Sequence, residues 1–155
     1  MGKKLLNLID KLNTENSIFI DTPFLIYHLE DVKPYSDVTS GILDSIAAKK
    51  SRIYLSLISF TEMLVGILKQ DNQFAERNFK SFFNSNPFID IVDFKFELTE
   101  PAACIRVETG LGLADSIVVA TAMNRSVRFL ITNDYKFKEL KNIDFEVMML
   151  DELVD

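Results

Sequence analysis

With 155 residues, of which 48% are hydrophobic and 26% charged, the chain has the size and composition of a globular domain, so we expect residues 1–155 to form a single domain. Its formal net charge of −6 excludes a protein that coats nucleic acid through bulk positive charge. Because Cys104 is the only cysteine and His28 the only histidine, the chain cannot form an internal disulfide or the usual zinc site, and a bound metal would need oxygen ligands.

Nothing in the sequence predicts contact with a membrane. No apolar run reaches the roughly 20 residues that a bilayer-spanning helix requires. The first residues, MGKKLLN, lack the apolar stretch and cleavage site of a signal peptide. We therefore expect a cytoplasmic protein.

Hydrophobic periodicity predicts an alternation of helices and strands along the chain. Leu5, Leu8 and Leu12 repeat at helical spacing, which predicts an additional amphipathic helix within residues 1–16, before a core of residues 17–150. The predicted strands are 17–20, 52–57, 88–92, 127–132 and 145–150. The predicted helices between them are 23–29, 38–50, 59–69, 73–84, 98–109 and 113–124.

Strands separated by helices of this length require crossover connections, which normally produce a parallel sheet with helices on both faces. The sequence therefore predicts a three-layer α/β/α fold. Its central sheet should be mostly parallel and have about five strands, one for each β-rich segment.

Four acidic residues occupy comparable places in this scheme. Asp21 and Asp134 follow predicted strands, Glu62 lies early in the helix after another strand, and Asp115 is in the first turn of a helix. In an open α/β sheet, ligands bind at the rim formed by these strand ends. We therefore treat the four carboxylates as candidate site residues.

Each of these acids also has a purely structural interpretation. Acids in the first turn of a helix offset the helix dipole, and Asp21 or Thr22 can cap the predicted helix 23–29. Residues 59–62 (SFTE) match the capping box, in which Glu62 would bond back to the backbone of Ser59. Residues 133–134 are of a type that suits turns. Taken singly, none of the acids proves a site.

Taken together, four carboxylates on one rim repel one another, and this repulsion costs stability unless cations or protons neutralise it. A hard divalent cation such as Mg²⁺ binds oxygen ligands and fits this pattern. Such an ion lowers the pKa of a bound water and stabilises the leaving oxygen of a phosphodiester. The pattern therefore favours hydrolysis of nucleic acid.

These residues resemble the PIN domain nucleases, and more closely the VapC-like toxins of bacterial type II toxin–antitoxin systems. The matching segments are 20–26 (IDTPFLI), 59–62 (SFTE), 113–122 (LADSIVVATA) and 131–134 (ITND), in the order and spacing of the family. The resemblance spans about residues 17–150 and implies a parallel sheet with helices on both faces.

The resemblance implies that the four acids are catalytic. Asp21, Asp115 and Asp134 would bind Mg²⁺ or Mn²⁺, and Glu62 would act directly or through water. Positioning roles would fall to Thr22, Thr132 and Asn133. The implied activity is endoribonucleolytic cleavage of RNA by the toxin of a toxin–antitoxin pair, with a cognate antitoxin as partner and a homodimer as the assembly.

Three features depart from the family pattern. Pro23 stands where the family often has Ser or Asn, Lys136 stands where many members have another acid, and the predicted N-terminal helix is an addition. A non-catalytic PIN-like module that binds RNA or a protein is the alternative function. A phospho-acceptor receiver domain has less support, because Leu150 is followed by two acids rather than by a lysine.

Other residues are weaker candidates. We expect His28 to be a packing or surface residue, and residues 110–112 (GLG) to be a helix stop and turn rather than a phosphate loop. Lysines such as Lys136 are candidate phosphate contacts, although solvated helix faces commonly carry such charges. The aromatic stripe Phe79, Phe82 and Phe83 is either part of the core or a surface that docks another chain.

Overall fold

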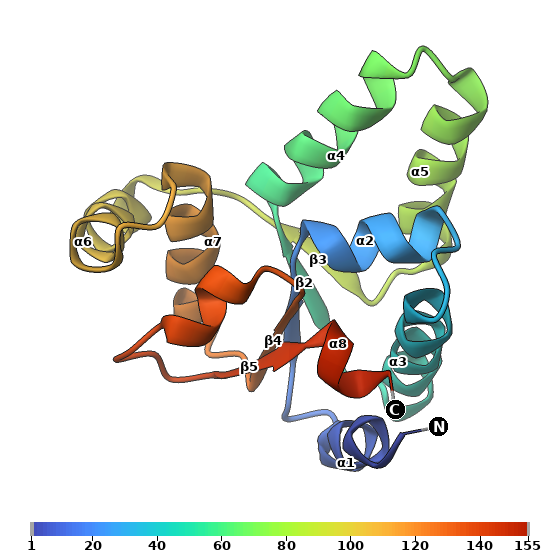
Figure 1. The fold of residues 1–155 in the computed structure, drawn as a ribbon, viewed down its shortest axis with the longest axis horizontal. Helices are drawn as coiled ribbons and strands as arrows, with labels where there is room; N and C mark the ends of the chain where they lie inside the picture. The colour runs from blue at the N-terminus through green and yellow to red at the C-terminus, as the bar shows by residue number, and fades with distance from the viewer. Residues whose placement is uncertain (1, 155) are drawn as a thin grey trace.

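Five parallel strands form the central sheet of the computed structural model, which describes residues 2–154 (Figure 1). Their order in the sheet is β3-β2-β1-β4-β5, and every neighbouring pair is parallel. The strands are β1 (Ile18–Ile20), β2 (Ile53–Ser56), β3 (Ile89–Val92), β4 (Phe129–Thr132) and β5 (Glu146–Met149). Each lies within its predicted segment, and the predicted parallel three-layer fold is confirmed.

The central strands are buried on both faces, as parallel sheets require. Along β1, Ile18 and Ile20 belong to one core cluster, whereas Phe19 between them belongs to the cluster on the opposite face. All three side chains are completely buried. Because successive side chains of a strand point to opposite faces, this short run contributes to both layers of the core.

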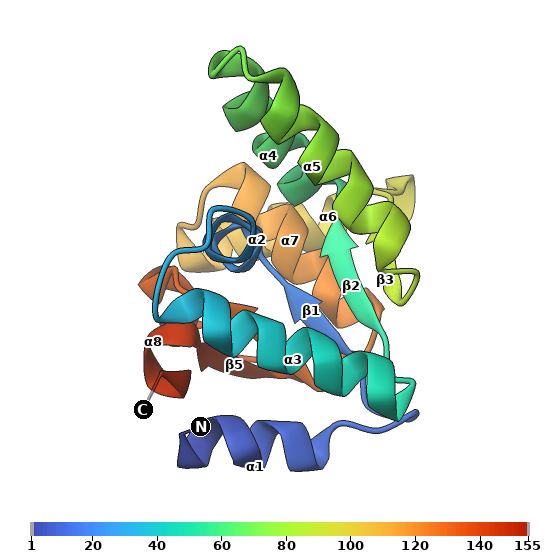
Figure 2. The ribbon, with the colours of Figure 1, turned by 90° about the vertical axis from the view of Figure 1, so that its right-hand side faces the viewer.

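Helices cover the two faces in separate groups (Figures 1 and 2). One face carries α1 (Lys3–Lys11), α2 (Thr22–Leu29), α3 (Tyr35–Lys49) and α8 (Leu150–Leu153), and the other carries α6 (Thr99–Thr109) and α7 (Leu113–Asn124). A helical hairpin of α4 (Leu57–Lys69) and α5 (Gln73–Ser85) projects beyond the sheet. No helix within residues 2–154 is long and apolar enough to span a bilayer.

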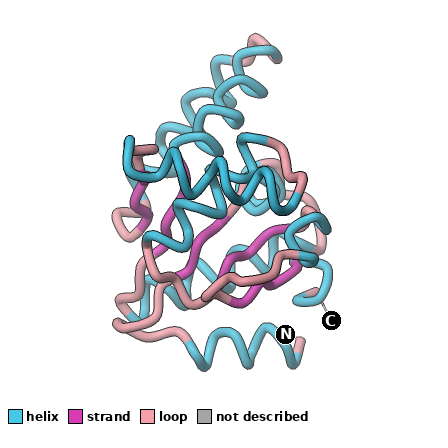
Figure 3. The backbone as a smooth tube through the Cα atoms, turned by 90° about the vertical axis from the view of Figure 1, so that its left-hand side faces the viewer, coloured by secondary structure: helices cyan, strands magenta, loops and turns pink. Residues whose placement is uncertain are grey.

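The additional N-terminal helix is part of the packed structure. Leu5, Leu8 and Leu12 are buried in the same cluster as the residues of α3 and α8. The Lys49 ammonium group donates a hydrogen bond to the backbone carbonyl of Ile9. Figures 2 and 3 show α1 lying along one side of the molecule, next to α3. The predicted amphipathic helix is thus present, and its apolar face is covered.

The aromatic stripe on α5 packs inside this chain. Phe79 and Phe82 are buried, and the Phe79 ring lies 5.0 Å from the ring of Phe60 on α4. Phe83 contacts Phe60 edge-on at 5.2 Å, and the Phe82 ring lies 5.3 Å from His28 on α2. The interpretation of this stripe as a docking surface is therefore wrong, because these rings hold α5 against α4 and α2. His28 is a packing residue, as expected.

Three short elements were not predicted, although two of them share one residue, Leu98 or Leu150, with a predicted segment. They are the 3₁₀ helices η1 (Phe96–Leu98) and η2 (Tyr135–Glu139) and the terminal helix α8. None is long enough to show a helical repeat of apolar residues, which is why periodicity cannot predict them. Two of them matter for the site, because η2 follows β4 directly and α8 follows β5.

Candidate metal centre

The four candidate acids are brought to the edge of the sheet where the strand order changes direction. From β1 the chain builds the sheet outward through β2 and β3, and then returns to place β4 on the other side of β1. Asp21 follows β1, and Asp134 follows β4. Such a switch point opens a crevice at the carboxyl ends of the strands, where α/β proteins bind ligands.

Asp21 is the buried centre of this region, with 6% of its surface exposed. Its Oδ1 accepts a hydrogen bond from the Ser59 hydroxyl at 3.3 Å, and its Oδ2 accepts one from the Thr132 hydroxyl at 3.0 Å. The pKa of Asp21 is raised to about 6, chiefly by burial and further by the charges of Asp115 and Glu62, while hydrogen bonds from the Thr22 backbone and the Thr132 hydroxyl lower it. At neutral pH the protein therefore holds a buried carboxylate that a bound cation would stabilise.

Glu62 is held by a side chain from another helix. The Thr22 hydroxyl, in the first turn of α2, donates to Oε2 of Glu62 at 3.0 Å. Helix α4 begins at Leu57, and its N-cap is Ser56, whose hydroxyl accepts a hydrogen bond from the amide of Ile58. The capping-box interpretation of residues 59–62 is therefore wrong. Ser59 and Glu62 share one face of α4, since residues three apart are neighbours on a helix.

Capping is also the wrong explanation for Asp21. This residue occupies the N-cap position of α2, yet its side chain makes no capping hydrogen bond to the helix. Both of its oxygens are engaged instead with hydroxyls of α4 and β4. The capping-box pattern assigned Ser59 to a helix cap, whereas the structure makes it a functional candidate. Its position three residues before Glu62 could have indicated this, because residues three apart lie on the same face of a helix.

Asp115 is positioned by the turn that separates α6 from α7. Gly110 ends α6 with φ +73°, a left-handed conformation that glycine adopts without strain, so the predicted helix stop is confirmed. A Cβ on Gly112 would lie 3.4 Å from Oδ2 of Asp115. The pKa of Asp115 is raised, first by burial and then by the charges of Asp134 and Glu62, while Lys136 lowers it.

Asp134 combines a turn role with its place at the rim. Its Oδ1 accepts a hydrogen bond from the Lys136 amide at 3.0 Å and so caps η2. Its own amide donates to the Thr132 hydroxyl, which in turn donates to Asp21. The Lys136 ammonium nitrogen lies 3.8 Å from Oδ2 of Asp134. The cation that departs from the family pattern thus lies directly at the acids.

The charges of the four acids are coupled to one another. Asp21 is coupled to Asp115 and Glu62, and Asp115 is coupled to Asp134 and Glu62. Within residues 2–154, no three Asp, Glu, His or Cys side chains form a preformed metal cluster. Mg²⁺ is commonly held by only one or two carboxylates together with waters. The donors here are all carboxylate oxygens around a buried charge, and they fit a hard divalent cation.

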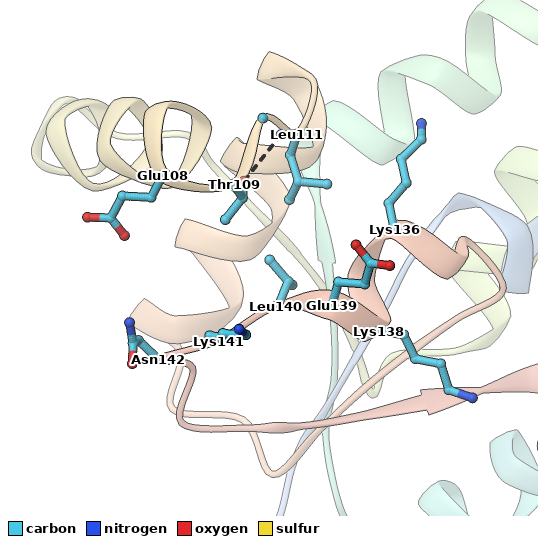
Figure 4. A pocket seen from close by; sticks show the side chains of 10 residues that line it. Glu108, Thr109, Leu111, Lys136, Lys138, Glu139, Leu140, Lys141 and Asn142 are labelled. Carbon is cyan, nitrogen blue, oxygen red and sulfur yellow. Dashed lines mark hydrogen bonds between the residues drawn. The ribbon is translucent and has the colours of Figure 1, made fainter.

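A groove of about 820 Å³ lies beside η2, and its lining includes Lys136 but none of the four acids (Figure 4). Residues 108–111 line one side, and residues of η2 with the following loop line the other. Figure 4 shows Lys136 and Lys138 pointing away from the groove in opposite directions. Lys136 lines this groove, and its ammonium nitrogen reaches Asp134.

Comparisons with known proteins agree with this fold. The chain of VapBC2 from Rickettsia felis, bound to a DNA fragment from its promoter, is 21% identical over 86% of this chain and 98% of its own, with a TM-score of 0.68. The chain of FitAcB from Neisseria gonorrhoeae is 21% identical over 84% of this chain and 96% of its own, with a TM-score of 0.63.

VapC20 from Mycobacterium tuberculosis, a sarcin-ricin loop cleaving toxin, is 14% identical over 81% of this chain and 98% of its own, with a TM-score of 0.60. These structures have the same fold as this protein. A comparison with curated proteins gave no match. The profile of the PIN domain family matches residues 18–143, which is most of the sequence, and the chain therefore belongs to the PIN domain family.

Proposed function

We propose that this PIN domain protein is a Mg²⁺- or Mn²⁺-dependent endoribonuclease and the toxin of a toxin–antitoxin pair. The observation that carries the proposal is the buried Asp21 carboxylate, which has both oxygens oriented by hydroxyl groups and is coupled to two further acids. A buried, oriented charge of this kind destabilises the folded protein when no cation is bound, and it provides a ligand when a cation binds.

Asp21 and Asp115 would hold the ion, with Asp134 as a further ligand and Glu62 acting directly or through water. When bound, a divalent ion supplies Lewis-acid chemistry, because it acidifies water and neutralises charge on phosphodiester oxygens. The chain itself fixes the ligands: Ser59 and Thr132 orient the two oxygens of Asp21, and Thr22 orients Glu62. Outer hydrogen bonds of this kind set the direction and basicity of metal ligands.

Lys136 is the nearest candidate for contact with the substrate. It lines the groove and reaches Asp134, so it would neutralise a phosphate on the strand that enters the site. The resemblance to VapC-like toxins favours RNA as this substrate, and VapC20 of similar fold is a sarcin-ricin loop cleaving toxin. Because the net charge of the protein is −6, this local cation would have a large share in binding RNA.

The proposed assembly rests on the resemblance to VapC-like toxins. VapBC2 and FitAcB have this fold, and we infer a cognate antitoxin as partner and a homodimer as the assembly of the toxin chain. Large apolar side chains remain exposed on the α4–α5 hairpin, with Leu68 62% and Phe74 64% exposed. Exposed apolar surface of this kind favours a protein interface there. We take residues 17–150 as the core of one domain, to which residues 1–16 add α1.

The second candidate is a non-catalytic PIN-like module that binds RNA or a protein. The observation in its favour is that no three acids within residues 2–154 meet in a preformed cluster. Under this alternative, the acids serve only as local hydrogen-bond partners, as Asp134 does for η2.

Cleavage of RNA by the purified protein with added Mg²⁺ or Mn²⁺ tests the proposal. We expect cleavage by the wild-type protein that EDTA abolishes, and none by Asp21→Asn or Asp115→Asn prepared in the same way. The two variants also control for contaminating nucleases, because these would be present in every preparation. Cleavage that survives both substitutions or EDTA would reject the assignment, and binding of RNA without cleavage would support the alternative.

A further inference from the structure

Asp151, in the short terminal helix α8, binds three side chains from two separate segments. Its Oδ1 accepts hydrogen bonds from the Tyr35 hydroxyl at 2.5 Å and from the Asn133 side-chain amide at 3.2 Å. Its Oδ2 accepts a hydrogen bond from the Tyr135 hydroxyl at 2.7 Å. The amide of Asp151 donates to Oδ1 of Asn133 at 3.1 Å, so that Asn133 is held by two hydrogen bonds to one residue.

The two residues that flank Asp134 are therefore both tied to Asp151. Asn133 precedes Asp134 and Tyr135 follows it, and no other acid of the candidate site has both sequence neighbours bound to one side chain within residues 2–154. Since a residue between two fixed neighbours has little freedom to rotate its backbone, these bonds restrict the direction of the Asp134 carboxylate. Restricted ligands cost less entropy when they bind an ion.

The carboxylate that holds this segment is itself fixed. Tyr35 is stacked on Tyr27 with ring centroids 4.4 Å apart, which joins α3 to α2. The three donors, Tyr35 first, keep the pKa of Asp151 below its ordinary value, so that the side chain remains a charged acceptor. A charged acceptor forms stronger hydrogen bonds than a neutral one.

Glu152, the next residue of α8, has different partners. It pairs with Lys4 of α1 at 3.5 Å and with Lys138 of η2, and its side chain forms no bond to residues 133–135 in the described structure. The neighbouring acid therefore provides a matched control, because its removal alters the charge of α8 to the same extent.

We propose that Asp151 is a positioning residue of the metal centre, which holds Asp134 in its binding orientation through Asn133 and Tyr135. The inference rests on the proposed function, since it assigns Asp134 a role in metal binding. Asp151 itself does not contact the ion or the substrate. This role extends the candidate site to the C-terminal segment of the chain. Asp151 lies beyond residues 18–143, which the family profile matches.

Three variants test the proposal: Asp151→Ala, Asp151→Asn and Glu152→Gln. The first measurement is hydrogen exchange of the Lys136 amide without metal, because this amide donates to Oδ1 of Asp134 and reports its orientation. The second is the affinity for Mn²⁺, measured by calorimetry. The third is the separation of kcat from KM in RNA cleavage, with thermal unfolding as a check that each variant is folded.

We expect Asp151→Ala to accelerate exchange of the Lys136 amide and to weaken Mn²⁺ binding by about 10-fold, a typical effect of losing an outer hydrogen-bond partner of a metal site. In RNA cleavage, Asp151→Ala should have a lower kcat and an unchanged KM for RNA. Asp151→Asn keeps an oxygen for Tyr35 and Asn133, and it should restore most of the affinity. Glu152→Gln should match the wild-type protein in all three measurements.

Unchanged Mn²⁺ affinity and a protected Lys136 amide in folded Asp151→Ala would overturn the proposal. Equal losses in Glu152→Gln would also overturn it, because they would indicate a general effect of α8. If the wild-type protein binds no Mn²⁺, the proposed function fails and Asp151 has no metal site to position. In that case, faster exchange of the Lys136 amide in Asp151→Ala would show that Asp151 has only a structural role, which is to hold the segment 133–135.

Discussion

Replacing Asp21 by Asn should stabilise the metal-free protein at neutral pH. The folded-state pKa of Asp21 is raised from 3.8 to about 6, so folding favours the protonated form. The stabilising contribution of this group is complete below pH 3.8 and is lost as the pH rises through about 6. A shift of about two units corresponds to roughly 3 kcal/mol of unfolding free energy at pH 8.

The gain in unfolding free energy from Asp21→Asn is smaller than this value. The NH₂ group of Asn must face one of the two hydroxyls that donate to the carboxylate of Asp21 in the wild-type protein. The Ser59 hydroxyl can rotate to accept, whereas the Thr132 hydroxyl, which already accepts from the Asp134 amide, can keep donating to the Asn oxygen. Imperfect replacement of one hydrogen bond costs about 1 kcal/mol. We therefore expect the variant to be more stable by about 2 kcal/mol at pH 8.

Urea unfolding in EDTA at several pH values between 4 and 8 measures this effect, with the exposed Asp93→Asn as the matched control. The advantage of Asp21→Asn over the wild-type protein should shrink as the pH approaches 4, and Asp93→Asn should show no such trend. Saturating Mn²⁺ should reverse the order, because an ion that binds at 100 times its Kd stabilises the folded state by about 2.7 kcal/mol. An Asp21→Asn protein that is no more stable than wild type at pH 8 would refute this reasoning.

Three further predictions concern the surroundings of the site. Lys136→Gln should raise the affinity for Mn²⁺ by about threefold, because it removes an exposed cation beside Asp134, and should weaken RNA binding; calorimetry and a salt series check both effects. Phe79→Ala should lower the unfolding free energy by about 3–5 kcal/mol in urea titrations, because its ring fills the buried contact with Phe60. Leu8→Ala should cost about 2–4 kcal/mol in the same assay if α1 is part of the folded core, whereas an independent helix would leave the midpoint unchanged.

The fold could be predicted because its signals are local. The run at β1 is short and β-rich, and its three residues are buried on both faces, as a central parallel strand requires. The crossover helices between the strands then restrict the sheet to a parallel arrangement. The strand order could not be derived in this way, because it depends on which distant strands pair, such as β1 with β4.

The candidate acids could be predicted for a related reason. Asp21 and Asp134 follow strands and Asp115 lies in the first turn of α7, so the position of each relative to the sheet edge is fixed by its own segment. Their partners could not be predicted. Ser59 is 38 residues from Asp21, and Asp151 is 116 residues from Tyr35, so no local pattern connects them. A local pattern also misassigned Ser59 to a cap that Ser56 provides.

The central claim is that carboxylates from separate segments form one cation site around Asp21. Calorimetric titration of Mn²⁺ into the wild-type protein at neutral pH, in parallel with Asp21→Asn and Asp115→Asn, tests it most directly. We predict saturable binding to the wild-type protein that both substitutions abolish. Absence of saturable binding, or binding that both variants retain, would contradict the account.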